Sequence, residues 1–258
     1  MRDVNMNPIR SVERAMDVLL SFSTDKPELS IEEITAATSI PKSTVYRLLC
    51  TLEKRSFVSF NEQTMKYKPG VQLFSLNALT PHILDVRAEA EDIMSDLHQK
   101  TGQTMIMAVP DGDEIIYVHK NERNTGLKFS SSIGQRRSFT YGVIGPSILA
   151  FQSNEDIDQA LADPREPMTD KTELSKDVML ERLRQLREEY IYVETDETTL
   201  GVTGVGAPVF DVNGSPVAGI GCIGPTIYME GQLEEIKEMV KTGAEHISKK
   251  MGFRFSYV

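Results

Sequence analysis

The sequence predicts an α+β protein in which an N-terminal winged helix-turn-helix precedes a larger domain of strands and helices. Three observations carry this prediction. Apolar residues recur at helical spacing in the first 54 residues, two short alternating segments follow, and strand-like segments mixed with amphipathic helices begin near residue 104. Strands flanked by helices, with hairpins near both ends, are typical of an α+β domain.

The charge of the chain is unevenly distributed. The 258 residues suffice for two modest domains and carry 28 Lys and Arg against 38 Asp and Glu, a net charge of −10. The first 78 residues hold 10 basic and 9 acidic side chains, and the remainder holds 18 and 29. Screening limits the reach of distant charges to about 8 Å at physiological salt, so a local basic patch in the first part can still bind phosphates.

Other features of the chain indicate its compartment. No apolar run approaches the length of a membrane span, and the first residues contain no apolar signal core, so we expect neither a membrane partner nor export. Two isolated cysteines, Cys50 and Cys222, do not form a disulfide framework and fit a reducing environment. We therefore expect a cytoplasmic protein.

The first two predicted helices lie before residue 39. The first runs from about Ser11 to Phe22, and its expected buried face consists of Val12, Ala15, Met16, Leu19 and Leu20. The second begins after Ser30, because Ser30 and Glu33 have the spacing of a capping box. Its residues expected to face inward are Ile31, Ile34 and Ala37.

A third helix over residues 41–55 has two distinct faces. Its apolar stripe is Val45, Leu48, Leu49 and Leu52. The other face carries hydroxyls, a phenol and cations, which suit the DNA major groove, where cations meet phosphates and polar groups reach base edges. The candidate DNA-binding residues on this helix are Lys42, Ser43, Thr44, Tyr46, Arg47 and Lys54.

Two alternating segments, 57–60 and 65–69, are joined by a polar loop and predict a β-hairpin wing. Lys66 and Lys68 lie on one face of this wing and complete the candidate DNA-binding set. Residues 1–69 then form the DNA-binding domain, with double-stranded DNA as the partner. A small three-helix bundle with solvated lysines is the alternative.

A linker helix is expected within residues 70–84, closed by Thr80 and Pro81, and residues 85–258 form the second domain. Its expected helices are 85–100, 143–151, 155–162, 175–189 and 230–250. Its expected strands are 104–109, 114–119, 128–133, 191–194, 204–210 and 217–223.

Four segments of the chain resemble the IclR family of bacterial transcription regulators: residues 11–19, 30–52, 185–201 and 207–225. The resemblance implies an N-terminal winged helix-turn-helix, a linker helix and a C-terminal GAF-like α/β domain that binds a small-molecule effector. It also implies a ligand-responsive regulator, as a repressor, that binds palindromic operators as a homodimer, with a homotetramer left open. Two recognition helices would then read two half-sites.

The same resemblance implies the residues of the effector pocket. They are Phe129, Arg137, Tyr141, Val143, Ile144, Glu194, Val202, Gly204, Gly221 and Ile223. The chain departs from the family pattern at three of these places, where Tyr141 enters a segment that has lost its usual lysine, Glu194 replaces an aspartate, and Gly204 replaces a small polar residue or a thiol. We therefore expect an effector other than glyoxylate or pyruvate.

Arg136, Arg137 and Tyr141 suggest the chemistry of that effector. Arginine can hold a carboxylate through two hydrogen bonds, and tyrosine can stack on a ring, so an aromatic or carboxylated metabolite is our hypothesis. The alternative is that both arginines form ion pairs at a surface or an interface.

Three further classes of function, a dinucleotide site, a metal site and an enzyme, lack a clear motif. Residues 219–224 read GxGxxG, but Pro225 follows where a dinucleotide site needs a helix, so no cofactor is expected and the glycines fit close backbone packing. The four histidines stand at no metal spacing, so no metal site is expected. No catalytic triad or P-loop is present, and we do not expect an enzyme, although an enzyme or a sensor that contacts protein remains an alternative.

Overall fold

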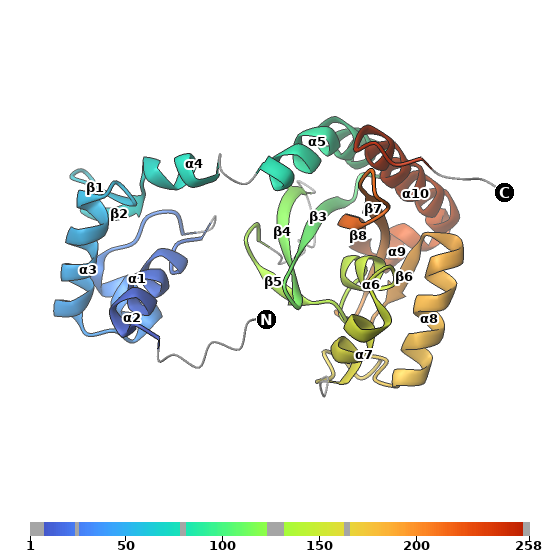
Figure 1. Ribbon diagram of the computed structural model, residues 1–258, viewed down its shortest axis with the longest axis horizontal. Coiled ribbons are helices and arrows are strands. Elements are labelled where there is room, and N and C mark those ends of the chain that lie inside the picture. The colour runs from blue at the N-terminus through green and yellow to red at the C-terminus, as the bar shows by residue number, and fades with distance from the viewer. Residues whose placement is uncertain (1–7, 24–25, 78–80, 123–131, 163–165, 255–258) are drawn as a thin grey trace. The chain divides into compact units, whose positions relative to one another are not determined.

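The computed structural model describes residues 8–23, 26–77, 81–122, 132–162 and 166–254. The chain divides into two compact units, unit 1 up to Pro81 and unit 2 from His82 onward (Figure 1). The division lies inside the segment 70–84 that we expected to join two domains. Among the described helices, none combines the length and the apolar character that crossing a membrane requires.

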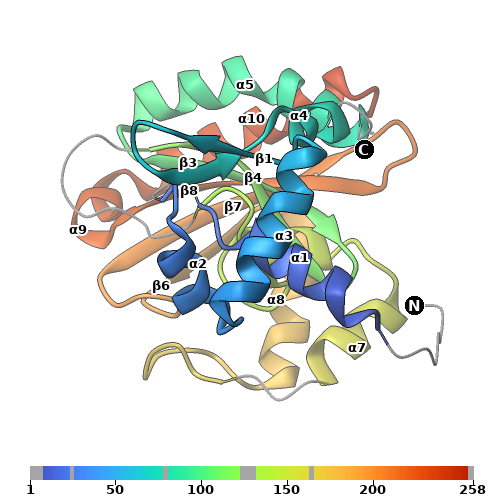
Figure 2. The ribbon, with the colours of Figure 1, turned by 90° about the vertical axis from the view of Figure 1, so that its left-hand side faces the viewer.

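Unit 1 is a winged helix-turn-helix, as predicted. Its described elements are α1 (Arg10–Leu20), α2 (Ile31–Thr38), α3 (Lys42–Lys54), β1 (Val58–Asn61), β2 (Lys66–Pro69) and α4 (Val71–Asn77). Helix α3 packs against both α1 and α2 (Figure 2). The core beneath it consists of Val18, Leu29, Ile34, Ile40, Val45, Leu49, Leu52, Val58 and Tyr67.

The start of α2 confirms the predicted capping box. The Glu33 amide donates to the Ser30 hydroxyl at 3.2 Å, and the Ser30 amide donates to the Glu33 carboxylate at 2.7 Å. Two amides that the helix cannot satisfy internally therefore gain partners. At the other end Ser39 adopts a left-handed conformation, φ 56°, which turns the chain toward α3.

The predicted buried face of α1 is confirmed at Leu19, which packs against the core of unit 1, and is wrong at three other positions. Val18, which we had not included, is fully buried, whereas Val12, Met16 and Leu20 are 50, 49 and 80% exposed. Helix α1 carries apolar residues on two sides, and it contacts α3 with the side centred on Val18. Ala37 of α2, also expected to face inward, is exposed as well.

The wing is a three-stranded arrangement at its base. Strands β1 and β2 pair antiparallel, and Leu29 adds a bridge to Tyr67 through amide–carbonyl hydrogen bonds of 2.9 and 2.8 Å. A glycine is required at position 70, because a side-chain carbon there would lie 2.2 Å from the Ser56 carbonyl oxygen. This close approach fixes the start of α4 against the segment that precedes β1.

Unit 2 is built on one antiparallel sheet in the order β5-β4-β3-β8-β7-β6. The strands are β3 (Thr104–Asp111), β4 (Glu114–Asn121), β5 (Arg136–Ser138), β6 (Tyr192–Thr195), β7 (Val202–Phe210) and β8 (Pro216–Pro225). The helices are α5 (Pro81–Thr101), α6 (Ile144–Leu149), α7 (Asn154–Ala162), α8 (Lys176–Glu189), α9 (Thr226–Met229) and α10 (Leu233–Lys250).

The sheet has an apolar core on each face. Alternate residues of its strands point to opposite sides, so Met105 and Met107 pack with α5 and α10, and Ile106 and Ala108 pack with α6 and α8. The helices accordingly cover both sides of the sheet (Figure 1). The predicted α+β class is confirmed by this architecture.

Helix α6 lies unusually close to the sheet. A side-chain carbon on Gly206 of β7 would be 2.4 Å from the Val143 carbonyl oxygen, and one on Gly219 of β8 would be 2.8 Å from the Ile144 side chain. Gly221 likewise faces Ile144 and Val143 at 3.2 Å. The glycines of the GxGxxG segment that face α6 therefore allow close packing, as the sequence indicated.

Three elements differ from their predicted boundaries. Pro81 does not close the linker helix but opens α5, where its missing amide hydrogen costs nothing. The strand predicted over 128–133 falls mostly outside the described residues, and the strand seen in this region is β5. Residues 226–232 form α9 and a short 3-10 turn, so α10 starts at Leu233.

Candidate functional sites

Helix α3 presents its predicted polar face to solvent. Lys42, Ser43, Tyr46, Arg47 and Lys54 are all exposed, and Tyr46 is 53% exposed despite its apolar ring. Thr44 is half-buried at the start of the helix. Val45, Leu49 and Leu52 anchor the opposite face in the core, and Leu48 is partly buried beside them, so the predicted division of this helix into two faces is confirmed.

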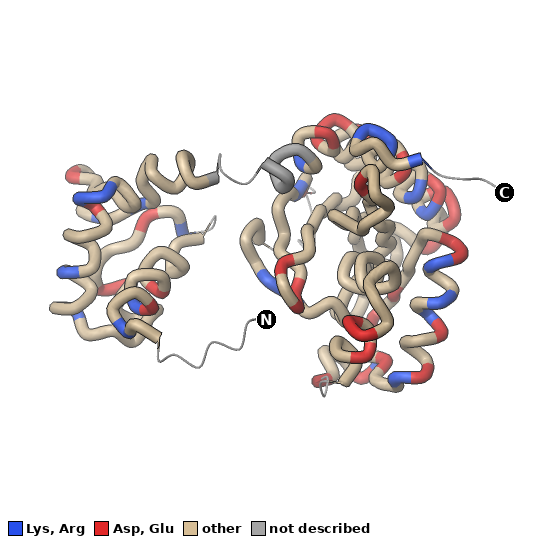
Figure 3. The backbone as a smooth tube through the Cα atoms, in the orientation of Figure 1, with Lys and Arg blue, Asp and Glu red and all other residues tan. Residues whose placement is uncertain are grey.

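The candidate DNA-binding cations of unit 1 fall into two groups. Lys42 forms an ion pair with Glu32, and Lys66 forms one with Glu33 at 3.0 Å. Arg47, Lys54 and Lys68 are exposed, and no ion pair with a described acid ties up their charges. Figure 3 shows basic residues along α3 and the hairpin, and acidic residues spread over the helices of unit 2.

A small cavity lies in unit 2 between the β5–α6 turn, the α7–α8 loop and strand β6. Its volume of about 10 Å³ gives room for about one water molecule. Two predicted effector residues line it, Tyr141 and Glu194. The other lining residues, which the sequence reasoning missed, are Thr140, Gly142, Thr172, Glu173, Met179, Tyr192, Glu197 and Thr198.

Arg137 lies next to this cavity and differs sharply from its neighbour Arg136. Arg136 is exposed and paired with Asp111 and, at 3.5 Å, with Glu114. The Arg137 Nη1 atom is buried and has no hydrogen-bond partner. It lies 3.9 Å from the position that a side-chain carbon would take on Gly142, a residue of the cavity wall. The two arginines therefore do not act together on one carboxylate.

Glu194 is an acid in a largely desolvated position at the cavity. Burial raises the pKa of its carboxyl, and the nearby charge of Glu197 raises it further. A hydrogen bond from Thr198 and the charges of Arg137 and Arg182 oppose this rise. The site therefore holds a carboxyl and a guanidinium close enough to influence each other, without an ion pair between them among the described contacts.

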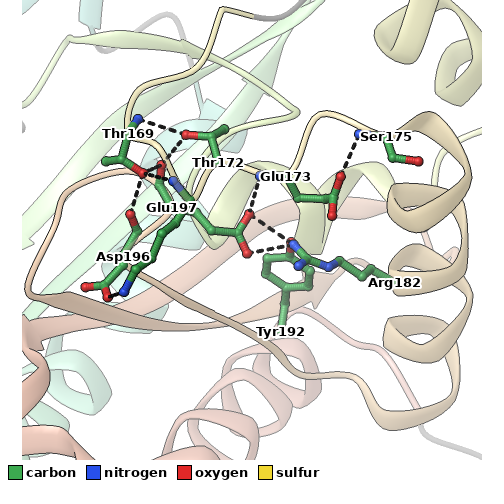
Figure 4. A network of polar contacts seen from close by, with 9 residues as sticks. Thr169, Thr172, Glu173, Ser175, Arg182, Tyr192, Asp196 and Glu197 are labelled. Carbon is green, nitrogen blue, oxygen red and sulfur yellow. Dashed lines mark hydrogen bonds and ion pairs between the residues drawn. The ribbon is translucent and has the colours of Figure 1, made fainter.

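The α7–α8 loop closes the cavity through a network centred on Glu197 (Figure 4). The Thr172 hydroxyl donates to the Glu197 carbonyl at 2.7 Å, and the Glu173 amide donates to the Glu197 carboxylate at 3.2 Å. Arg182 of α8 donates to both oxygens of that carboxylate, at 2.8 and 3.0 Å. These partners are 15 to 25 residues apart in sequence, so no spacing rule could have found them.

The same loop is held at other points. The Thr169 hydroxyl donates to the Asp196 carbonyl at 2.7 Å, and Lys171 forms an ion pair with the Asp196 carboxylate. The Tyr141 hydroxyl donates to the Glu166 carbonyl at 2.7 Å. Because its hydroxyl is engaged in this way, Tyr141 helps to close the cavity in the structure.

The remaining predicted effector residues lie in the packing between α6 and the sheet. Val143 and Ile144 are buried, and Gly204 and Gly221 face them from the strands. Ile223 belongs to the same core, with Val202 packed against it. None of these residues lines the described cavity. Phe129 lies outside the described residues.

Two known domain families match the chain, one in each unit. The IclR helix-turn-helix domain profile matches residues 11–62, and that of the C-terminal domain of the bacterial transcriptional regulator IclR matches residues 79–249. The HTH-type transcriptional regulator KdgR of Escherichia coli K12 is 29% identical over 253 residues, which cover 97% of this chain and 96% of KdgR.

Two solved structures show the same fold. The IclR of Thermotoga maritima is 27% identical with a TM-score of 0.77, covering 95% of this chain and all of that one. An IclR homolog of Microbacterium hydrocarbonoxydans, solved with 4-hydroxybenzoate, has a TM-score of 0.82 at 17% identity, covering 93% of this chain and 98% of its own. Together with the two matched domains, these relatives confirm the resemblance drawn from the sequence: the chain belongs to the IclR family of bacterial transcription regulators.

Proposed function

We propose that this regulator is a ligand-responsive repressor that binds a palindromic operator as a homodimer, through α3 and the wing of unit 1. The observation that carries the DNA contact is the exposed polar face of α3 with the unpaired cation Arg47. Ser43, Tyr46 and Arg47 would reach base edges, and Lys54 and Lys68 would meet phosphates. Because the proposed partner is DNA, we expect this bacterial regulator to act in the cytoplasm.

The exposed apolar stripe of α1 supports the homodimer. Val12, Met16 and Leu20 follow one another at intervals of four residues, which places them on one side of the helix, open to solvent in the single chain. A contiguous apolar patch of this kind is typical of a protein–protein contact. A second copy would cover it with its own stripe in a two-fold arrangement, and two α3 helices would then serve two half-sites.

For the effector we propose the cavity of unit 2, bounded by Tyr141, Glu194 and the α7–α8 loop, with Arg137 beside it. A buried cationic atom without a partner is costly in a folded protein, and such a group commonly marks a place where a ligand completes the hydrogen bonding. The largely desolvated carboxyl of Glu194, which has a hydrogen bond with Thr198, is a second polar group at this site.

The DNA contact is tested with an operator fragment selected from a random-sequence library. Arg47→Ala should weaken binding by about 1–3 kcal/mol, because the lost guanidinium contacts DNA and its removal leaves the core of α3 intact. Lys176→Ala is the matched control, since it removes an exposed cation from unit 2 that pairs with Asp158. Equal affinities of the wild type and Arg47→Ala would refute the role of α3.

A further inference from the structure

A groove of about 450 Å³ lies on the surface of unit 2, between the helices α5 and α10, which run side by side (Figure 1). Its lining residues recur every three or four positions, from residue 92 to 100 of α5 and from residue 235 to 246 of α10. Residues at this spacing share one face of a helix, so each helix forms one wall of the groove. At 1.5 Å per residue the walls are about 12 to 17 Å long, which is two to three helical turns.

The floor of the groove is apolar and already formed in the single chain. Ile93, Leu97 and Met239 line it, and all three are part of the core of unit 2 or pack against that core. Gly243 of α10 allows α5 to come close, because a side-chain carbon there would lie 2.7 Å from Leu97 Cδ1 and 3.5 Å from Ile93 Cγ2. The packing of the two helices therefore fixes the floor, and no partner is needed to create it.

The rim of the groove is acidic on both sides. Each helix contributes two exposed carboxylates to the lining: Asp92, Asp96, Glu235 and Glu238. The basic groups of the lining are His246 and Lys100, and Lys100 is paired with Asp96 at 2.7 Å. Among the ion pairs of the described residues, none engages Asp92, Glu235 or Glu238. An apolar floor thus lies between two walls that both carry unpaired negative charge.

This combination disfavours several kinds of partner. The carboxylates repel the phosphates of nucleic acids and of anionic lipids. An extended peptide gains affinity from backbone hydrogen bonds with the edge of a sheet, and two helices, whose backbone groups pair internally, do not offer such an edge. A second copy of the same face, related by a two-fold axis, would bring the acidic rims of both copies together.

We propose that the α5–α10 groove binds a short amphipathic helix of another protein, in which lysine or arginine flanks the apolar stripe on both sides. Such a helix satisfies its own backbone groups and lays its stripe on the apolar floor. Its cations meet Asp92 on one wall and Glu235 and Glu238 on the other. This surface shares no residue with the DNA-binding face of unit 1 or with the cavity at Glu194, so the regulator would have a third binding surface.

The proposal is tested by fluorescence anisotropy of the full chain with three labelled peptides of about 14 residues, or four helical turns. The first consists of leucine and lysine, with the leucines on one face of the helix. The second has the same composition in an order that gives no stripe, and the third has glutamate in place of lysine. We expect the first to bind at least about 10-fold more tightly than the others, because binding needs both the stripe and the cations. Absence of binding by the first, or equal binding by the second, would overturn the proposal.

Two double variants separate the groove from the general acidity of the chain. Asp92→Asn with Glu238→Gln removes one carboxylate from each wall and should weaken binding of the leucine–lysine peptide about 2- to 30-fold. Glu155→Gln with Glu189→Gln, at exposed positions of α7 and α8, changes the net charge by the same amount and should leave binding unchanged. Equal effects of the two double variants would show a non-specific attraction and contradict the assignment to the groove.

A further variant fills the groove and tests for a second copy as its occupant. Thr242 is an exposed residue of the lining, so Thr242→Arg should weaken peptide binding at least about 10-fold and leave the midpoint of thermal unfolding close to that of the wild type. Sedimentation velocity should give this variant the same mass as the wild type. Unchanged peptide binding would refute the site, and a lower mass would show that another copy of the chain occupies the groove in place of a different protein.

Discussion

Glu194 lies in the effector site that we propose, and its burial there has a cost in stability. Its carboxyl lies among Thr198, Glu197, Arg137 and Arg182, and burial is the main reason that its pKa is raised. An acid whose pKa is higher in the folded than in the unfolded state favours folding most when it is protonated. The free energy of unfolding therefore falls as pH rises from the ordinary glutamate pKa to the raised one.

Replacing Glu194 removes this pH dependence. In Glu194→Gln the midpoint of thermal unfolding should decline less, relative to wild type, as pH rises through that window, because the amide does not ionise. The measurement is a series of calorimetric scans at increasing pH on both proteins. The difference between the two proteins isolates Glu194 from other acids such as Glu32, whose pKa is lowered chiefly by a hydrogen bond with Lys42. If the unfolding midpoints of the two proteins changed in parallel with pH, the burial of Glu194 would have no effect on the pH dependence of stability.

Gly206 is a residue where a single methyl group should destabilise unit 2. The methyl of Gly206→Ala would lie 2.4 Å from the Val143 carbonyl oxygen, which belongs to the backbone and cannot rotate away. Overpacking of this kind costs about 1–3 kcal/mol. Urea unfolding measures the loss. Gly231→Ala is the control, because no atom lies within 4 Å of its added carbon, and a similar loss in both variants would contradict the packing argument.

The candidate site could be predicted only in part from individual residues. Tyr141 and Glu194 were found because they stand in segments that resemble the family pattern. Thr172 and Glu173 belong to a loop without periodicity, and they reach the cavity only through contacts with Glu197 across 24 and 25 residues of sequence. The pairing of Arg136 and the orphan state of Arg137 also depend on which face of β5 each side chain takes, which a three-residue strand does not reveal.

Among the elements, α1 shows the limit of helical periodicity. Its apolar residues occupy two sides, and periodicity alone selects a stripe in which Val12, Met16 and Leu20 stay exposed in the single chain. The helices α2 and α3 were predicted more accurately, because the capping box fixes one start and a single apolar stripe fixes the orientation of the other. Pro81 was misassigned because a proline suits both the end of one helix and the start of the next.

The exposed stripe of α1 leads to a prediction about assembly. Leu20→Glu should weaken operator binding about 10- to 100-fold and shift the protein in solution from dimer toward monomer. The reason is that a charge placed in an apolar contact is desolvated without a partner. Sedimentation velocity and DNA binding measure the two effects. Ser11→Glu adds the same charge to an exposed polar position of the same helix and should change neither, and unchanged behaviour of Leu20→Glu would exclude this helix face as the contact.

In the whole molecule, the excess of acidic charge lies after residue 78, because the first 78 residues hold 10 basic and 9 acidic side chains and the remainder holds 18 and 29. Arg47, Lys54 and Lys68 of the proposed DNA-binding surface have no ion pair among the described residues, and the acidic remainder disfavours non-specific contact with DNA. The logarithm of the operator binding constant should therefore fall linearly with the logarithm of salt concentration. Lys68→Ala should reduce that slope by about one unit if Lys68 contacts a phosphate, and Lys100→Ala, which removes a paired cation of unit 2, should not. An unchanged slope in Lys68→Ala would remove the wing from the interface.

If the effector binds in the closed cavity as proposed, the closure also affects the effector concentration at which this regulator responds. If only a fraction of the molecules has the α7–α8 loop open at any moment, the apparent dissociation constant of the effector is the intrinsic one divided by that fraction. Removing a hydrogen bond that holds this loop closed, for example the one from Thr172 to the Glu197 carbonyl, would then make the protein sensitive to lower concentrations of the same compound. Evolution could in this way retune the threshold of a genetic response without altering the groups that recognise the signal.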